Sequence, residues 1–376
     1  MILTVREWEF LKLLCWCKTV PIPEDWCGGI YDKTMVAVLE YLGLVWCSRN
    51  GKYIRPRPSA YRLLETEGCH FIGDAKPQTN QRTLDRRNTA ARVLFTFYTA
   101  GSNVFKDHVG EVPDGAVYLP SFAARSANIG NPFGSTKFYG IFQTTETLYL
   151  VFFVDDAGIY FQKELTLFHS YIDRSPIQKT GLIFMGGSTS EIGNTIFHAH
   201  SPTEQAKKKY NTDSFGKVFS ATSLPVHFVP IGREGAQMLR YIAMPQYRER
   251  MAKLILRRSY QPPYDGLPDT DAVHYQPPHL PAAITLDMDI KRIDRAIIAA
   301  KEQGFPKIVL YALPEQMSFL REHYKGQADV IMVNTAGLEK ELGAMRDGQE
   351  KTAPYFTKEG RCIDVADFAV CRKNKA

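Results

Sequence analysis

The stretch 32–57 constrains the fold most, because it combines a capped helix with a tight hairpin. Asp32 is a good N-cap, since its carboxylate accepts hydrogen bonds from the free N–H groups of a first helical turn. Apolar residues then recur at helical spacing as far as Leu42, and Gly43 suits the left-handed position that ends a helix. The Asn-Gly dipeptide at 50–51 is the strongest short signal for a β-hairpin. We therefore predict a helix followed by a two-stranded hairpin.

The hairpin is basic. Five basic residues and no acidic residue lie between positions 49 and 62. A cationic hairpin beside a helix suits duplex DNA, whose phosphates flank the groove that a helix enters. The residues expected to contact DNA are Lys33, Thr34, Arg49, Lys52, Tyr53, Arg55 and Arg57. The alternative is an interaction module in which the basic hairpin is only a solvated edge.

Helices are also predicted on both sides of this stretch. Thr4 and Glu7 form a capping box at the start of the first helix, in which each side chain caps the other's backbone. Pro23 and the two acids after it suit the first turn of a short second helix. A last helix is expected over 59–65. Together these elements predict a winged helix-turn-helix domain over residues 1–68.

Composition agrees with a cytoplasmic DNA-binding protein without requiring one. The net charge is +6, and no apolar run approaches the roughly 18 residues that cross a bilayer. Charged residues occupy the N-terminal segment where a signal peptide would be apolar. The seven cysteines include no Cys-x-x-Cys pair, so reduced thiols are expected rather than disulfides or zinc.

After a polar linker expected at 69–83, the chain is predicted to form an α/β mixed-sheet region over 84–345, followed by a C-terminal tail over 346–376. A division of the central region near 260–281, which is rich in proline, stays open. Three closely spaced antiparallel strands and then β-α repeats with parallel strands are expected. The expected strands lie at 137–143, 147–154, 159–163, 181–185, 226–231, 283–290, 307–312 and 328–333.

Three segments of the sequence resemble the replication-relaxation family of Gram-positive plasmids and integrative conjugative elements. They are TVREWEFLKLLCW, MVAVLEYLGLVWCSRNGKYIRPRPSAYRLLE and NTAARVLFTFY. The resemblance implies a winged helix followed by a restriction-endonuclease-like domain, often degenerate. It also implies a DNA-binding accessory protein in replication, DNA relaxation or transfer, whose partners are double-stranded DNA and relaxase or replication proteins.

The restriction-type nuclease motif is incomplete here. That chemistry needs an Asp and a Glu-x-Lys on adjacent strands, which hold Mg²⁺ and stabilise the attacked phosphate. Asp155, Asp156 and Glu164 are available, but Leu165 and Thr166 follow Glu164, so the lysine is missing. We therefore expect no catalysis at this position.

A second acidic pair is Asp287-Met-Asp289. In a strand, positions i and i+2 face the same side, so the two carboxylates would share one Mg²⁺ or Mn²⁺ in a nuclease. The favoured interpretation is that both are exposed at the end of a strand, with Asp289 capping the next helix.

Upstream, a basic helix at 246–260 is either a second phosphate contact or a solvated face.

A third candidate is His198-Ala-His200 with Tyr210. Two histidines around one residue of a strand both point one way and can bind a metal, and rolling-circle nickases and relaxases use such a pair with a tyrosine nucleophile. The favoured interpretation is that the histidines interact with the dipole at a helix C-terminus.

The first hypothesis is therefore an accessory DNA-binding protein without its own catalysis and without a cofactor. A metal-dependent nickase or nuclease is the second, and a transcription regulator with a ligand-sensing α/β domain is the third. Enzymatic activity and homodimer formation stay open.

Overall fold

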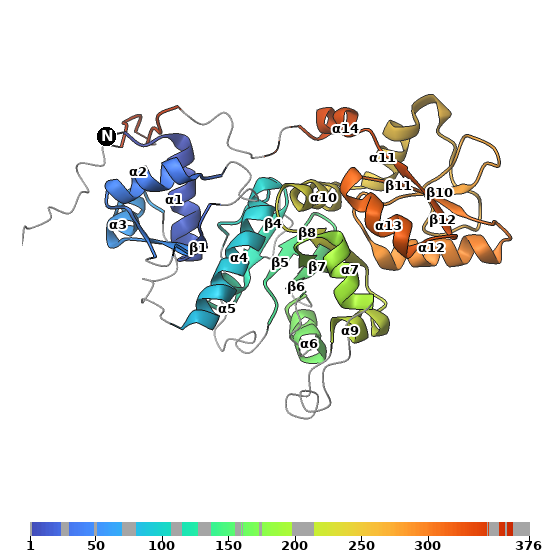
Figure 1. Ribbon diagram of the computed structural model, residues 1–376, viewed down its shortest axis with the longest axis horizontal. Helices are drawn as coiled ribbons and strands as arrows, with labels where there is room; N and C mark the ends of the chain where they lie inside the picture. The colour runs from blue at the N-terminus through green and yellow to red at the C-terminus, as the bar shows by residue number, and fades with distance from the viewer. Residues whose placement is uncertain are drawn as a thin grey trace, which may run out of the picture. The chain divides into compact units, whose positions relative to one another are not determined.

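The computed structural model divides the chain into two compact units, and each is described by itself (Figure 1). Unit 1 contains residues 1–99 and 346–376, and unit 2 contains residues 100–345. The described residues are 2–23, 30–48, 51–69, 80–106, 115–126, 137–154, 159, 161–172, 175–197, 214–343, 345, 353–357 and 359–363.

Unit 1 contains four helices and a small antiparallel sheet among its described residues. The elements are α1 (Val5–Cys17), β1 (Val20–Pro21), α2 (Lys33–Tyr41), β2 (Val45–Cys47), β3 (Tyr53–Pro56), α3 (Pro58–Thr66) and α4 (Gln81–Thr99). The strand order is β1-β3-β2. The predicted caps are confirmed, since Thr4 and Glu7 form the capping box and Asp32 accepts from the Met35 N–H at 2.8 Å. The helix expected after Pro23 falls on residues outside the described ranges.

The boundaries of unit 1 differ from those expected. The division falls after Thr99 instead of within 69–83, because α4 packs against α1 and β1. Residues 346–376 also belong to this unit instead of forming a separate tail. Tyr355 explains the second difference, because its N–H donates to the Leu3 carbonyl at 2.8 Å and its ring stacks on Trp8 with centroids 4.4 Å apart.

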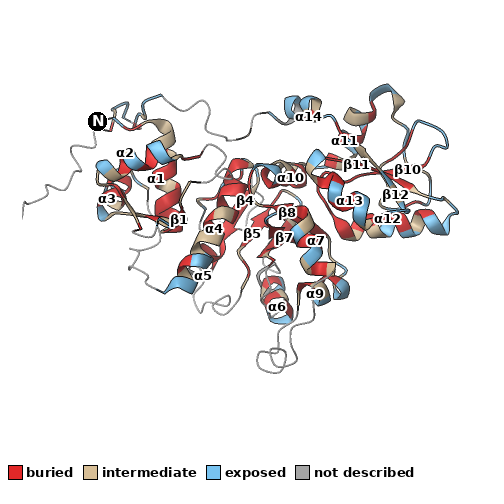
Figure 2. Ribbon diagram, viewed as in Figure 1, coloured by how far each residue is buried: buried red, intermediate tan, exposed pale blue. Residues whose placement is uncertain are grey.

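Unit 2 begins with a five-stranded mixed sheet of order β4-β5-β6-β7-β8. Strands β4 to β6 pair antiparallel, and β6 to β8 pair parallel. Figure 2 shows β7 and β8 mostly buried. The elements are β4 (Val117–Pro120), α5 (Ser121–Ser126), β5 (Gly140–Gln143), β6 (Thr147–Phe153), α6 (Phe161–Ile172), β7 (Lys179–Gly186), α7 (Thr189–Phe197), α9 (Phe215–Ala221) and β8 (Val226–Pro230).

The prediction of one strand in this sheet was wrong. The segment 159–163 was expected to be a third antiparallel strand, but α6 begins at Phe161. This segment forms a helix because its buried residues are spaced three and four apart, as on one face of a helix. These residues are Phe161, Glu164 and Phe168. The expected antiparallel block is still three-stranded, since β4 takes the place of the missing strand.

The second sheet of unit 2 has the order β12-β11-β10-β9. Its strands β10, β11 and β12 are parallel, so the predicted β-α repeats are confirmed. The elements are α10 (Arg233–Ala243), α11 (Tyr247–Leu256), η2 (Arg257–Ser259), β9 (Ala272–Val273), β10 (Pro281–Ile284), α12 (Ile290–Glu302), β11 (Ile308–Ala312), η3 (Pro314–Gln316), α13 (Met317–His323), β12 (Ala328–Met332) and α14 (Thr335–Leu342).

The two sheets of unit 2 meet at the turn after β10. The Phe228 N–H of β8 donates to the Met288 carbonyl at 3.1 Å, and His227 forms an isolated antiparallel bridge with Asp289. The turn 285–289 therefore lies against β8 of the other sheet. The chain is a mixed α/β protein, as predicted. None of the helices in the described ranges has the length and apolar character needed to cross a membrane.

Candidate functional site

The predicted DNA-contacting residues of α2 are exposed. Lys33 and Thr34 form the first turn of α2, directly after the cap Asp32, and both are exposed. Lys52 is exposed beside Gly51, whose φ of +63° fits the expected hairpin turn. Arg49 lies outside the described residues.

The other three hairpin residues are half-buried and have local contacts. The Arg55 guanidinium lies over the Tyr53 ring at 4.8 Å and over the Trp46 ring at 5.7 Å. Arg57 donates from Nε to the Val45 carbonyl at 2.8 Å. Burial and the charge of Arg55 both lower the pKa of the Arg87 guanidinium, so a residue of α4 adds to the positive charge near this hairpin.

Most candidates for nuclease chemistry fall outside the described residues. These are Asp155, Asp156, His198, His200 and Tyr210. Glu164 is described, and it is buried in α6 instead of facing a site. Its carboxylate accepts hydrogen bonds from the N–H groups of Lys137 at 2.7 Å and Phe138 at 3.0 Å, so it holds the segment that leads into β5.

We expect the variant Glu164→Gln to lower the free energy of unfolding by about 1–3 kcal/mol, because its amide keeps one acceptor and loses the charge. Urea unfolding followed by circular dichroism measures this change. The control is Glu146→Gln, since the Glu146 side chain is 46% exposed and pairs with Lys179 at 3.5 Å. Equal losses in both variants would contradict the capping role.

Asp287 and Asp289 are buried, which corrects the expectation that they are exposed. They also lie in a turn instead of a strand, because β10 ends at Ile284 and Met288 has a φ of +51°. The expected cap is confirmed, since Asp289 Oδ1 accepts from the Arg292 N–H at 3.2 Å at the start of α12. The same oxygen accepts from the Val226 N–H of β8 at 3.4 Å.

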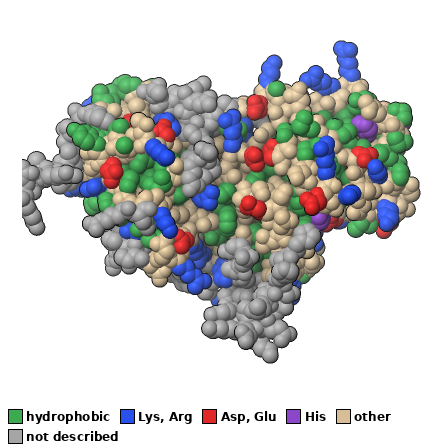
Figure 3. All heavy atoms as spheres, viewed as in Figure 1, with side chains coloured by type: hydrophobic (Ala, Val, Ile, Leu, Met, Phe, Trp, Pro, Cys, Tyr) green, Lys and Arg blue, Asp and Glu red, His purple; other side chains and the backbone are tan. Residues whose placement is uncertain are grey.

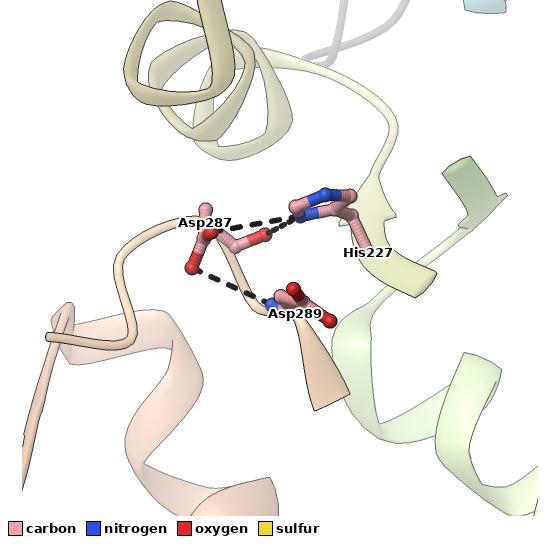
Figure 4. Close-up of side chains that lie close together, drawn as sticks. All are labelled: His227, Asp287 and Asp289. Atoms are coloured by element: carbon pink, nitrogen blue, oxygen red, sulfur yellow. Dashed lines mark hydrogen bonds and ion pairs between the residues drawn. The ribbon is translucent and has the colours of Figure 1, made fainter. Parts of the chain in front are cut away.

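His227 faces this turn from β8 (Figure 4). Its Nδ1 lies 2.9 Å from the Asp287 carbonyl oxygen and 3.8 Å from Asp287 Oδ2. His227, Asp287 and Asp289 each offer one ligand atom, and these three atoms lie within 4.8 Å of one another. We call these three residues the His-Asp-Asp cluster. The cluster combines an imidazole and two carboxylates, a set of donors that can hold a divalent metal ion.

Arg248 and Tyr247 reach the cluster from the first turn of α11. Arg248 Nη2 lies 3.4 Å from Asp287 Oδ2 and 3.4 Å from Asp289 Oδ2. Burial on its own raises the pKa of Asp287, but the charges of Arg248, Arg292 and His227 and a hydrogen bond from Tyr247 lower it to about 2. The Asp287 carboxyl is therefore ionised at neutral pH.

Another arginine, Arg292, is buried and supports the turn. Arg292 of α12 is 1% exposed, and its Nη1 lies 2.7 Å from Asp271 Oδ2 and 3.1 Å from the Asp269 carbonyl. Its Nη2 donates to the Ile284 carbonyl at the end of β10. Arg292 therefore connects α12 to both ends of the segment that precedes the cluster.

A pocket of about 830 Å³ opens beside the cluster. It lies within unit 2, at the N-terminal ends of β6, β7 and β8 and against the segment from α10 to α11. Its volume is in the range of sites for small molecules and cofactors. Its lining includes Tyr149, His227, Tyr247, Arg248, Asp271 and Asp287.

Sequence reasoning found the two aspartates but missed their partners. His227 lies within a predicted strand and Arg248 within a predicted basic helix, and neither belongs to a local motif. The one available signal was His227, a polar residue within an apolar run, whereas Arg248 lies among other polar and charged residues. Compared with known proteins, the chain matches no family model, and no curated protein or solved structure is significantly similar to it. The resemblance to the replication-relaxation family therefore stays a prediction.

Proposed function

We propose that unit 1 is a winged-helix module that binds double-stranded DNA, with α2 entering the major groove and the β2–β3 hairpin against the phosphate backbone. The observation that carries this proposal is the pairing of a helix whose first turn exposes Lys33 and Thr34 with a hairpin that contains Lys52, Arg55 and Arg57 and no acid. The resemblance extends the proposal to an accessory role in replication, DNA relaxation or transfer.

The surroundings of the hairpin support this proposal. Arg55 is held over two aromatic rings, which orders the guanidinium on the hairpin. On the face shown in Figure 3, by contrast, Lys and Arg side chains are interspersed with Asp and Glu. A local basic element is therefore a better basis for DNA binding than the modest net charge of +6.

We expect the full-length double variant Lys33→Gln, Lys52→Gln to bind duplex DNA more weakly than the wild type. Both side chains are exposed, so their replacement removes charge without disturbing the core. If both lysines contact phosphates, a plot of the logarithm of the DNA association constant against the logarithm of the salt concentration becomes shallower. Its slope changes by about 0.9 for each lost contact, or nearly two in total. Fluorescence anisotropy between about 50 and 200 mM salt measures this slope.

The matched control is Lys253→Gln, Lys307→Gln, which makes the same change in net charge on exposed lysines of unit 2. The proposal requires this control to bind like the wild type. Equal affinity and equal salt slope in the Lys33, Lys52 variant and the wild type would refute the proposed contacts.

A further inference from the structure

The His-Asp-Asp cluster places two buried carboxylates against one guanidinium and one imidazole. Asp287 and Asp289 are 0% and 1% exposed, and both pair with one guanidinium, that of Arg248. Two other acids at the pocket each have a cation of their own: Glu249 pairs with Lys253 at 2.6 Å and Asp271 pairs with Arg292 at 2.7 Å. When the imidazole is neutral, Arg248 balances only one of the two carboxylates, and a buried carboxylate without a counter-charge is costly, so the cluster then favours an added cation.

A metal ion can take the place of the Arg248 guanidinium beside these carboxylates. Its two contacts of 3.4 Å are longer than the roughly 2.7–2.9 Å of strong charge-assisted hydrogen bonds. Its side chain is 36% exposed and lines the pocket, whereas the side chain of Arg292 is 1% exposed. Arg248 is therefore the arginine that an incoming cation can displace, once its hydrogen bond to the Tyr247 hydroxyl at 3.3 Å breaks, whereas Arg292 is enclosed.

Besides the two carboxylates, His227 offers a nitrogen ligand for a metal ion. It is 3% exposed, and within the described part of the chain its Nε2 has no hydrogen-bond partner. Nδ1 donates to the Asp287 carbonyl in this structure. A metal ion that replaces this proton takes Nδ1 as its ligand, and the ring then carries its proton on Nε2. The imidazole nitrogen and one oxygen of each carboxylate lie within 4.8 Å of one another, so small side-chain shifts bring all three to the bonds of about 2.1 Å that a small divalent ion makes.

We propose that His227, Asp287 and Asp289 bind one divalent cation of the Mn²⁺ class, and that the ion displaces the Arg248 guanidinium into the pocket. The charge of the ion balances the two carboxylates. The released guanidinium then faces a pocket of about 830 Å³, where it can pair with an anionic group such as a phosphate. This site lies in unit 2 and does not depend on DNA binding by unit 1.

The decisive experiment measures Mn²⁺ binding to the full chain by calorimetry. The wild type is expected to bind one Mn²⁺, and Asp287→Asn to bind it at least about tenfold more weakly. Arg248→Met is expected to bind Mn²⁺ about ten- to a hundredfold more tightly, because the competing guanidinium is gone. The control Arg250→Met, an exposed arginine on the same helix, is expected to bind like the wild type.

Two further measurements separate metal binding from a purely structural ion pair. Pulsed electron paramagnetic resonance of the Mn²⁺ complex is expected to show a directly bound nitrogen that disappears in His227→Gln. Mn²⁺ is also expected to raise the melting temperature of Arg248→Met more than that of the wild type, since at one ligand concentration a ligand of the folded state stabilises it more the more tightly it binds.

The proposal is overturned if the wild type binds no Mn²⁺, or if Arg248→Met binds it no better than the wild type. A nitrogen signal that persists in His227→Gln would also overturn it. If Asp287→Asn fails to fold, the affinity and the melting temperature of Arg248→Met still decide the outcome.

Discussion

Replacing Arg292 with methionine is expected to lower the free energy of unfolding of unit 2 by about 3–5 kcal/mol. The guanidinium is buried and joins Asp271, the Asp269 carbonyl and the Ile284 carbonyl. Methionine fills a similar volume, but it leaves the Asp271 carboxylate, itself 8% exposed, without its cation. The loss therefore comes mainly from an uncompensated buried charge and less from lost packing.

Urea unfolding of the full chain, followed by circular dichroism, measures this loss. Tryptophan fluorescence provides an internal reference, because all four tryptophans lie in unit 1 and its transition is expected to stay unchanged. The matched variant is Arg295→Met, since Arg295 lies one turn further along α12 and pairs with Asp269 at 2.7 Å, but is 48% exposed. It is expected to cost about 0–1 kcal/mol. Similar costs for the two variants would contradict the assigned role of burial.

The second large effect is expected for Gly235→Ala in α10. A Cβ at this position would lie 1.6 Å from the Pro230 carbonyl oxygen and 2.8 Å from the Pro230 carbonyl carbon. Both are backbone atoms at the end of β8, so a side-chain rotation cannot relieve the contact. The helix must move away from the strand, and we expect a loss of about 3 kcal/mol or more in the free energy of unfolding.

Thermal unfolding followed by circular dichroism tests this prediction, with Gly337→Ala in α14 as the control. The nearest atom to a Cβ at Gly337 is Arg257 Nη2 at 3.9 Å, so that variant makes no clash. Alanine in place of a helical glycine is expected to be neutral or to stabilise by up to about 1 kcal/mol. A wild-type melting temperature for Gly235→Ala would show that the close packing of α10 on β8 is not required.

Features that depend on a few neighbouring residues were predictable. The caps at Thr4, Asp32 and Asp289 involve residues within three positions of one another, so their side chains identify them in the sequence. The parallel repeats after residue 280 were also predictable, since apolar strand runs alternate with amphipathic helices. The segment 159–163 was misassigned because a short apolar run fits both periods, and burial of Glu164 in a helix was the deciding fact.

The sequence by itself determined the caps, the basic hairpin, the mixed α/β architecture and the Asp287-Met-Asp289 pair. Only the tertiary structure decided that these carboxylates are buried, and that His227 and Arg248 meet them from β8 and α11. The physical reason is distance along the chain, because about 60 residues separate His227 from Asp287 and about 39 separate Arg248 from it. No local pattern records such contacts, since they form when the turn after β10 packs against β8 of the neighbouring sheet.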